Sequence, residues 1–474
     1  MILQYFQKLK QTDLGNQPKG GILITILVFV TVFLIIASGL LGLVNQQRKL
    51  IRQKEASALA LQIAEAGLNY YRWHLAHALE DYADGTSETG CYPCGPYLHE
   101  YIDPGGGLVG YFELTITPPD PDYPGSTVIK IKSSGWTVTH PNTKRHTAVL
   151  LGIPSLARYT TVVDDNINYG STAITYGPVH SNGGVKFEGT AHNIVSSALE
   201  QYWYDDAWRD GVWTSQPNPG EVFLAGTEFP VPAVDFAGFT QNLGTMENYA
   251  DSEGILLGPS GYQGYHIQFL GNGDFQYRIV ETKTASCNGE DTGGIASYHG
   301  DWQMSEIPDN GLIFAKDNVW VDGQLNHDRV TVIAAEEPLD TGNSDIFLNN
   351  DLLYTNKDGL DVIGLIAQDN VIIGLYAEDD LEIDAVLIAK NGRRFRPDYE
   401  SVFRCGSTAI RERFTLYGTT ITKETPYMNS GSSGYENREY IYDPNTLYAP
   451  PPFFPTTGEY EFISWEEILD GESY

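Results

Sequence analysis

The chain has 474 residues, enough for two or more domains, and a formal net charge of -32 from 61 acidic and 29 basic side chains. A surface this acidic excludes general binding to nucleic acid or to anionic lipid, because both would repel it. The 49 glycines and 30 tyrosines, with little helical periodicity after Asp84, predict a mainly β body with many turns.

The N-terminal region combines a polar leader, residues 1–20, with an uninterrupted apolar run from Ile22 to Val44. A run of about 23 uncharged residues is long enough to cross a bilayer core, whereas the apolar part of a signal peptide spans about 7–15 residues. From Leu61 to Tyr82 apolar residues recur at three- and four-residue steps, which places them on one helix face. The sequence therefore predicts one helix over residues 21–83 that spans a membrane first and then packs against the body. Gly67, in mid-helix, predicts a close approach or a bend, because glycine there is about 1 kcal/mol less favourable than alanine.

The segment around the start of this helix, Gly20-Gly21-Ile22-Leu23-Ile24-Thr25, resembles the processing site of type IV prepilins. In that family a prepilin peptidase cuts after a glycine, so cleavage would fall between Gly20 and Gly21. The fifth position, a glutamate in major pilins, is Thr25 here, as fits PilX-type minor pilins and tip-like pseudopilins of type II secretion, which lack the glutamate. Residues 61–68, with the sequence Leu-Gln-Ile-Ala-Glu-Ala-Gly-Leu, are similar to the Ala-Glu-Ala-rich segment of PilX-like proteins.

This resemblance implies a minor pilin or pseudopilin, a structural subunit of a type IV pilus or of a type II secretion-like filament. Its implied partners are the prepilin peptidase and, through the helix, the major and other minor pilins. The protein would cross the inner membrane once, with its body outside the cytoplasm, before entering a cell-surface filament. The alternative is a simple single-span anchor whose glycine pair is a juxtamembrane bend, carrying a β-helical adhesin or glycan-binding head.

The four cysteines, Cys91, Cys94, Cys287 and Cys405, are an even number, which suits disulfides in an oxidising compartment. Cys91-x-x-Cys94 could be a redox pair, half of a zinc site or a local disulfide. Its glycine- and proline-rich surroundings do not suit a redox motif, and Cys287 and Cys405 are too far apart to complete a zinc site. We expect a local disulfide at Cys91 and Cys94, leave open whether Cys287 pairs with Cys405, and expect no metal or cofactor.

Residues 84–155 contain three β-rich runs, Val109–Ile116, Val128–Val138 and Ala148–Ile153. Apolar and polar residues alternate in the first run, which predicts one buried and one exposed face. We expect a small antiparallel sheet on the C-terminal part of the helix, similar to the way pilin heads begin.

Residues 156–423 carry a repeated theme, Ala-x-Asp-Asn/Asp followed by apolar residues at alternate positions. Short strands joined by small polar turn residues that stack between coils predict a right-handed parallel β-helix. Long insertions and irregular spacing keep a β-sandwich as the alternative. The copies are Gly311–Val321, Gly364–Ile373, Leu375–Ile383 and a degenerate one at Pro178–Phe187.

The sequence predicts no enzyme. A β-helix that cleaves polysaccharide needs clustered acids with a basic partner, and Asp379 and Asp380 fall at a turn where aspartate is already explained. His180, in a His-Ser-Asn-Gly setting, is interpreted as a structural histidine. A membrane-tethered glycan lyase or hydrolase is thus the least favoured alternative. Residues 340–345 offer oxygen ligands for calcium but lack the distant bidentate glutamate, so we expect a solvated loop.

The only basic cluster of the acidic body is Arg393, Arg394 and Arg396, followed by three further arginines up to residue 413. It is a candidate interaction patch for an acidic partner, with intramolecular salt bridges as the default interpretation. Residues 424–474 are expected to form a proline-rich extended tail, with a last short helix over residues 463–469.

Overall fold

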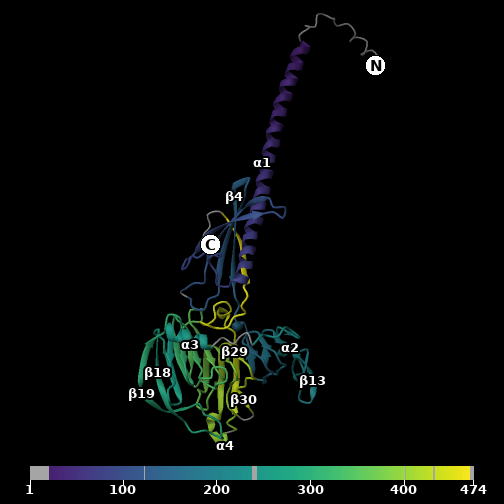
Figure 1. The fold of residues 1–474 in the computed structure, drawn as a ribbon. Helices are drawn as coiled ribbons and strands as arrows, with labels where there is room; N and C mark the ends of the chain where they lie inside the picture. Colours follow the sequence, from purple (N-terminus) through teal and green to yellow (C-terminus); the bar gives the residue numbers. More distant parts are fainter. Residues whose placement is uncertain (1–20, 122, 237–242, 401, 431–432, 470–474) are drawn as a thin grey trace, which may run out of the picture.

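The computed structural model describes residues 21–469 except 122, 237–242, 401 and 431–432. Figure 1 shows three parts in a row: a long helix, a small sheet beside its C-terminal half, and a larger β-rich head. The chain is therefore mainly β with one long N-terminal helix and a small antiparallel sheet, as the sequence predicts.

Helix α1 spans Gly21–His77, 57 residues. The predicted end near residue 83 is wrong by about a turn and a half of α-helix. The chain turns away because Asp81 caps the following loop: its carboxylate accepts from the backbone N–H groups of Ala83 and Gly85, and lies 3.0 Å from His74 Nε2. The buried positions of α1 all lie in its C-terminal part, at Ala56, Ala60, Ile63, Ala64, Gly67, Leu68, Tyr71 and Leu75.

The small sheet is five-stranded and antiparallel, in the order β1-β2-β3-β4-β32. The expected C-terminal helix over residues 463–469 is wrong. This segment belongs to the last strand of the sheet, because it pairs with the free edge of β4. An open edge offers partners for a whole row of backbone groups, which outweighs a weak local preference for helix. The strands are β1 (Cys94–Ile102), β2 (Leu108–Thr117), β3 (Ile129–Thr137), β4 (His140–Gly152) and β32 (Glu461–Ile468).

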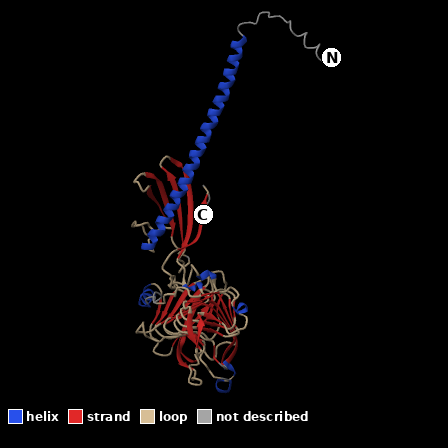
Figure 2. Cartoon of the chain, turned by 90° about the vertical axis from the view of Figure 1, so that its right-hand side faces the viewer, coloured by secondary structure: helices blue, strands red, loops and turns tan. Residues whose placement is uncertain are grey.

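The C-terminal part of α1 lies directly on this sheet, as Figure 2 shows from the side. A Cβ atom on Gly135 of β3 would come 3.0 Å from the Cα of Ala64, and closer still to other backbone atoms of the helix. A Cβ atom on Gly67 would come 2.8 Å from the ring of Phe112. The two glycines therefore let helix and sheet approach closely, which confirms the predicted role of Gly67.

The head is inserted between β4 and β32. Ser155, after β4, forms an antiparallel bridge with Thr456, before β32, and Thr457 N–H donates to Pro154 O at 2.9 Å. The entry and exit of the head thus lie side by side. Its last long strand, β31 (Ser433–Ile441), pairs in parallel with strands of the head, so residues 424–474 are not one extended tail.

One long ladder of parallel strands organises the head. The chain enters this ladder in its middle, at β5, and runs from there to one end of the ladder, at β15. It then starts again at the opposite end, with β16, and runs back toward the middle. There β29 pairs with β5, with Thr420 opposite Thr161. The strands in spatial order are β16 (Ile255–Leu257), β20 (Leu312–Ala315), β22 (Arg329–Ala334), β25 (Val362–Ala367), β27 (Asp380–Ala389), β29 (Ile410–Thr422), β5 (Thr161–Val163), β8 (Val179–Ser181), β11 (Val195–Ser197) and β15 (Thr227–Glu228).

Further parallel ladders enclose the same core as the first. One runs through β24 (Leu352–Tyr354), the starts of β27 and β29, then β31, β7 (Ala173–Thr175) and β10 (Thr190–Ala191). Another runs through β17 (Gly264–Leu270), β21 (Val319–Leu325), β23 (Ile346–Phe347), β26 (Val371–Ile372) and β28 (Arg394–Phe395). A short one joins β6 (Ile167–Tyr169), β9 (Val185–Phe187) and β14 (Val212–Trp213).

Smaller elements decorate this framework. Strands β18 (Asp274–Lys283) and β19 (Ile295–Glu306) extend β17 as an antiparallel meander. The others are the hairpin β12 (Gln201–Tyr204) and β13 (Ala207–Asp210), β30 (Asn429–Ser430), α2 (Pro219–Val222), α3 (Leu243–Ser252) and α4 (Val402–Cys405).

Two of the sequence repeats coincide with stacked positions. Ala315 and Ala367, from the copies at Gly311–Val321 and Gly364–Ile373, lie in line with Ala334 and Ala389 on neighbouring strands. At the adjacent corner, the side chains of Asn318, Asp345 and Asn370 each accept a backbone N–H from the next layer at 2.8, 2.9 and 3.1 Å. Small polar residues therefore link successive layers at this turn, and two of them, Asn318 and Asn370, belong to the repeat.

Candidate functional site

The N-terminal half of α1 is an exposed apolar surface. Every residue from Gly21 to Leu50 is exposed except Ala37, which is half-buried. Ile22, for example, is 77% exposed. Among the described residues, α1 is the one helix long and apolar enough to cross a membrane, and no residue of its most apolar stretch is buried. This half of the helix extends beyond the sheet in both views (Figures 1 and 2).

The hydroxyl groups within this surface are satisfied by the helix itself. Thr25 Oγ1 donates to Gly21 O at 2.9 Å, and Thr31 and Ser38 donate to carbonyls three or four residues earlier. Such back-bonding removes the need for an external partner in an apolar environment. Thr25 thus places no unpaired polar group in the apolar surface.

The predicted processing site is only partly described. Gly20 lies outside the described residues, and Gly21 is the first residue of α1.

The four cysteines form two disulfides. Cys91 is bonded to Cys94, with their Cα atoms 4.8 Å apart, beside the start of β1. Cys287 is bonded to Cys405, with a Cα separation of 5.8 Å, and joins the loop after β18 to α4.

The proposed arginine patch is not a surface patch. Arg394 and Arg396 are each 1% exposed. Arg396 donates to the carbonyls of Gly374, Leu375 and Thr408. The charge is held inside because the guanidinium has enough donors to satisfy several inward-pointing carbonyls at once.

Aromatic rings lie against the two buried arginines, and two of the remaining arginines form ion pairs at the surface. The guanidinium of Arg396 lies over the rings of Tyr399 and Tyr435, and that of Arg394 over Phe414 and Tyr440. At the surface, Arg393 pairs with Glu424 and Arg413 with Asp380. The arginines of this cluster are therefore engaged within the molecule, as in the default interpretation of the sequence.

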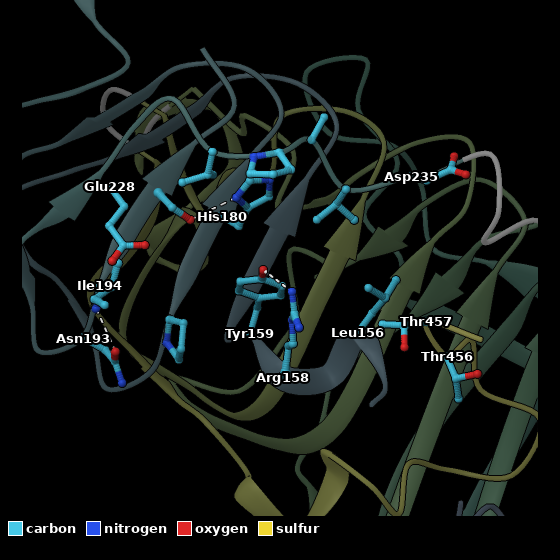
Figure 3. Close-up of a pocket in the computed structure, with 16 residues that line it drawn as sticks. Leu156, Arg158, Tyr159, His180, Asn193, Ile194, Glu228, Asp235, Thr456 and Thr457 are labelled. Carbon is cyan, nitrogen blue, oxygen red and sulfur yellow. Dashed lines mark hydrogen bonds between the residues drawn. The ribbon is translucent and has the colours of Figure 1, made fainter. Parts of the chain in front are cut away.

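One pocket of the head lies beside the entry of the chain, with a volume of about 650 Å³. Figure 3 shows it between the first head strands, the segment 231–235 and the exit at Thr456 and Thr457. Most of its wall is apolar, and Arg158, Glu228 and Asp235 supply its charged groups.

His180 lies in this pocket, but both of its ring nitrogens are engaged. Nε2 lies 3.1 Å from Asn182 Oδ1, and Nδ1 lies 3.0 Å from Ser196 Oγ. Burial lowers the pKa of His180. Asn182 also bonds the backbone of Val234 in both directions, at 2.8 Å each, so the group holds the segment in place. The geometry suits a structural histidine.

A second pocket, of about 340 Å³, lies on the flank of the head. Its polar centre is a buried pair, His266 Nε2 and Asp322 Oδ2, 2.8 Å apart. Asp322 also accepts from Gln268 and Asn350 at 2.8 Å each, and Tyr298 Oη lies 2.8 Å from His266 Nδ1. Burial opposes ionisation of Asp322, yet its hydrogen bonds with His266, Asn350 and Gln268 hold its pKa below the usual value.

Sequence reasoning missed this second pocket. Its residues come from β17, β19, β21 and the turn after β23, and no short motif links them. Only the pairing of β17 with β21, which places His266 opposite Trp320, brings them together.

No group of three or more His, Cys, Asp or Glu is placed to hold a metal ion within the described part of the chain. In the segment 340–345, expected to be a solvated loop, Asp345 accepts from the backbone and side chain of Asn370. Burial raises its pKa to about 6.

Among known proteins, similarity is found with solved structures. No family model matches the sequence, and no curated protein matches it. Among solved structures, the competence-associated pilin ComZ from Thermus thermophilus is similar, with 14% identity and a TM-score of 0.28 over 88% of this chain and 98% of that chain. Because the TM-score is this low, the function proposed below rests on the residues of this chain alone.

Proposed function

We propose that this chain is a pilin-like filament subunit, of the minor pilin or pseudopilin type. Prepilin peptidase would remove residues 1–20, and the helix would hold the protein in the inner membrane as a single span. The subunit would then enter a type IV pilus or a type II secretion-like filament by packing α1 among the helices of major and minor pilins. The role is structural, with no reaction and no cofactor.

One observation carries the proposal: α1 has two halves with opposite surroundings. From Ala56 onward one face of it is covered by the antiparallel sheet, whereas residues 22–44 leave their large apolar side chains exposed. Burying a single Val, Leu, Ile or Phe side chain contributes about 1.5–3 kcal/mol, so a surface of this length requires an apolar environment. A bilayer supplies that environment first, and neighbouring helices supply it in a filament.

The side chain at Thr25 favours a position that needs no carboxylate pairing. A glutamate in the apolar segment would need a partner for its charge, whereas the Thr25 hydroxyl is bonded within its own helix. This fits a subunit that does not use the pairing attributed to major pilins.

Two features favour a body outside the cytoplasm. All four cysteines are in disulfides, which persist in oxidising compartments. The acidic net charge gives a soluble surface that would be repelled by anionic headgroups.

We further propose that the head is a right-handed parallel β-helix rather than a β-sandwich. The support is the long run of parallel pairs from β16 to β15, because sandwiches are built from antiparallel strands. The side-chain links between layers at Asn318, Asp345 and Asn370 support the same architecture.

The test is N-terminal sequencing of the membrane-extracted protein, produced with and without a prepilin peptidase. We expect a product that begins at Gly21 only when the peptidase is present, and no such product from a Gly20→Leu variant. The processed protein should then co-purify with major pilin. Retention of Met1 under both conditions would refute the assignment and favour the anchored adhesin.

A further inference from the structure

The pocket around His266 and Asp322 has the composition of a small-ligand site. Its wall includes the aromatic rings of Trp320, Tyr298 and Tyr376, and Tyr376 is 51% exposed at its rim. A volume of about 340 Å³ lies at the small end of the range of roughly 300–1,000 Å³ for ligand pockets. The site therefore has room for one small ring.

The floor of the pocket is held in place before any ligand arrives. Trp320 stacks on Phe347 with ring centroids 4.5 Å apart and an interplanar angle of 11°. Trp320 Nε1 donates to Gly293 O at 2.6 Å, and Asn349 Nδ2 donates to the same oxygen at 2.7 Å. A rigid floor reduces the entropy lost on binding.

The hydrogen-bonding groups that remain available in the pocket are mostly acceptors. A carboxylate only accepts, so His266 Nε2 donates to Asp322. Tyr298 Oη lies 2.8 Å from His266 Nδ1 and keeps at least one lone pair for a ligand. Asp322 Oδ1 accepts one bond, from Gln268, and Asn350 Oδ1 accepts none from the described residues, while Asn350 Nδ2 donates one bond to Asp322 and keeps a second hydrogen. A ligand that is rich in donors and also has an acceptor fits these groups.

The charges around the pocket disfavour an anion. Burial and the charges of Asp351 and Asp322 raise the pKa of Glu378, which shows that carboxylates gather here. Two cations lie against rings of the pocket, Arg278 over Tyr298 and Lys283 over Trp320. Each already has an acceptor: Lys283 pairs with Asp291 at 2.9 Å, and Arg278 Nε donates to Gly300 O at 2.7 Å.

We propose that this pocket binds an uncharged or amine-bearing sugar unit of a glycan. The exposed ring of Tyr376 suits the apolar face of a sugar ring, and the acceptors suit the hydroxyl or ammonium hydrogens of the sugar. Uronic acids and other anionic sugars are rejected by the carboxylates. The site does not require the chain to assemble into a filament, so this inference can fail or hold independently of the proposed function.

The experiment uses the full chain in a detergent without a sugar headgroup, because a glucoside or maltoside headgroup belongs to the proposed ligand class. The protein is screened on an array of neutral, amino-sugar and uronic-acid oligosaccharides, and the strongest hit is titrated by calorimetry. We expect hits among neutral or amino sugars. The absence of any such hit, or a preference for uronic acids, would overturn the proposal.

A matched pair of variants locates the binding. Tyr376→Ala removes an exposed ring from the rim and should weaken binding at least about tenfold, a loss of about 1.4 kcal/mol. Tyr176→Ala removes a ring of similar exposure, 45%, that stacks on His192 outside this pocket, and should leave the affinity unchanged. Equal affinities of both variants and the unmodified chain would place the sugar elsewhere and refute the assignment.

Discussion

Gly135→Ala should loosen α1 from the small sheet. The added Cβ would come 3.0 Å from Ala64 Cα and closer to Ala60 O and Ala64 N, whereas ordinary contacts begin at 3.4 Å. All three atoms belong to helix backbone, so no side-chain rotation can relieve the overlap. The helix and β3 must therefore move apart.

The size of the effect follows from that movement. A separation of roughly 0.5–1 Å forfeits a quarter to a half of the dispersion energy of the contacts it opens. These contacts include Ile63, Leu68 and Leu75, which are fully or almost fully buried in the layer between helix and sheet. Overpacking of this kind typically destabilises by about 1–3 kcal/mol, so we expect a loss of about 2 kcal/mol.

Hydrogen exchange followed by mass spectrometry measures this loss region by region. A destabilisation of about 2 kcal/mol should speed exchange through sub-global opening about 30-fold in peptides from β1 to β4, β32 and residues 56–77. Peptides from the head serve as an internal standard. Gly258→Ala is the matched control, because its Cβ would meet nothing within 4 Å and its φ is not positive. Unchanged exchange in the sheet of Gly135→Ala would show that the contact with the helix is not as tight as described.

Three further outcomes are expected. Replacing residues 156–455 by a short glycine–serine linker should leave a folded five-stranded sheet, since Ser155 and Thr456 already form a bridge where the chain enters and leaves the head. Loss of β signal in circular dichroism would contradict this. Arg396→Ala should destabilise the head by several kcal/mol, at about 1–3 kcal/mol for each carbonyl left unpaired, whereas Arg404→Ala, exposed at 64%, should change its thermal unfolding little. Burial raises the pKa of Asp345 and of Asp384 to about 6, so their contribution to stability is present below about pH 4 and is lost as the pH rises through 6. The head should thus lose stability between about pH 4 and about pH 6, and a double Asn variant of the two aspartates should show a smaller loss in urea titrations.

Local patterns in the chain were sufficient for the parts of the fold that depend on nearby residues. The apolar run and the stripe from Leu61 predicted a single helix, because both signals arise within the 3.6-residue period of the element itself. The alternation in residues 109–116 likewise predicted β2. The boundary near residue 83 failed because the stop at His77 is set by Asp81 and its bonds to a loop, which no periodicity encodes.

The arginine cluster shows why a candidate site can look different in sequence and in space. Six arginines within a short stretch indicate a basic surface, yet the burial of Arg394 and Arg396 depends on carbonyls of Gly374 and Thr408 and on aromatic rings from other layers. The sign of the charge could be predicted from the sequence, but its exposure could not.

By itself, the sequence determined the long helix with its apolar and amphipathic halves, the small antiparallel sheet and the polar turns of the repeat, since each is a local pattern of side chains. Only the tertiary structure decided that β29 lies beside β5, that residues 461–468 form a strand, and that His266 meets Asp322 and Tyr298. These features join segments tens to hundreds of residues apart. Such pairings are chosen by the burial and hydrogen bonding of the whole molecule, because many distant partners satisfy the same local pattern.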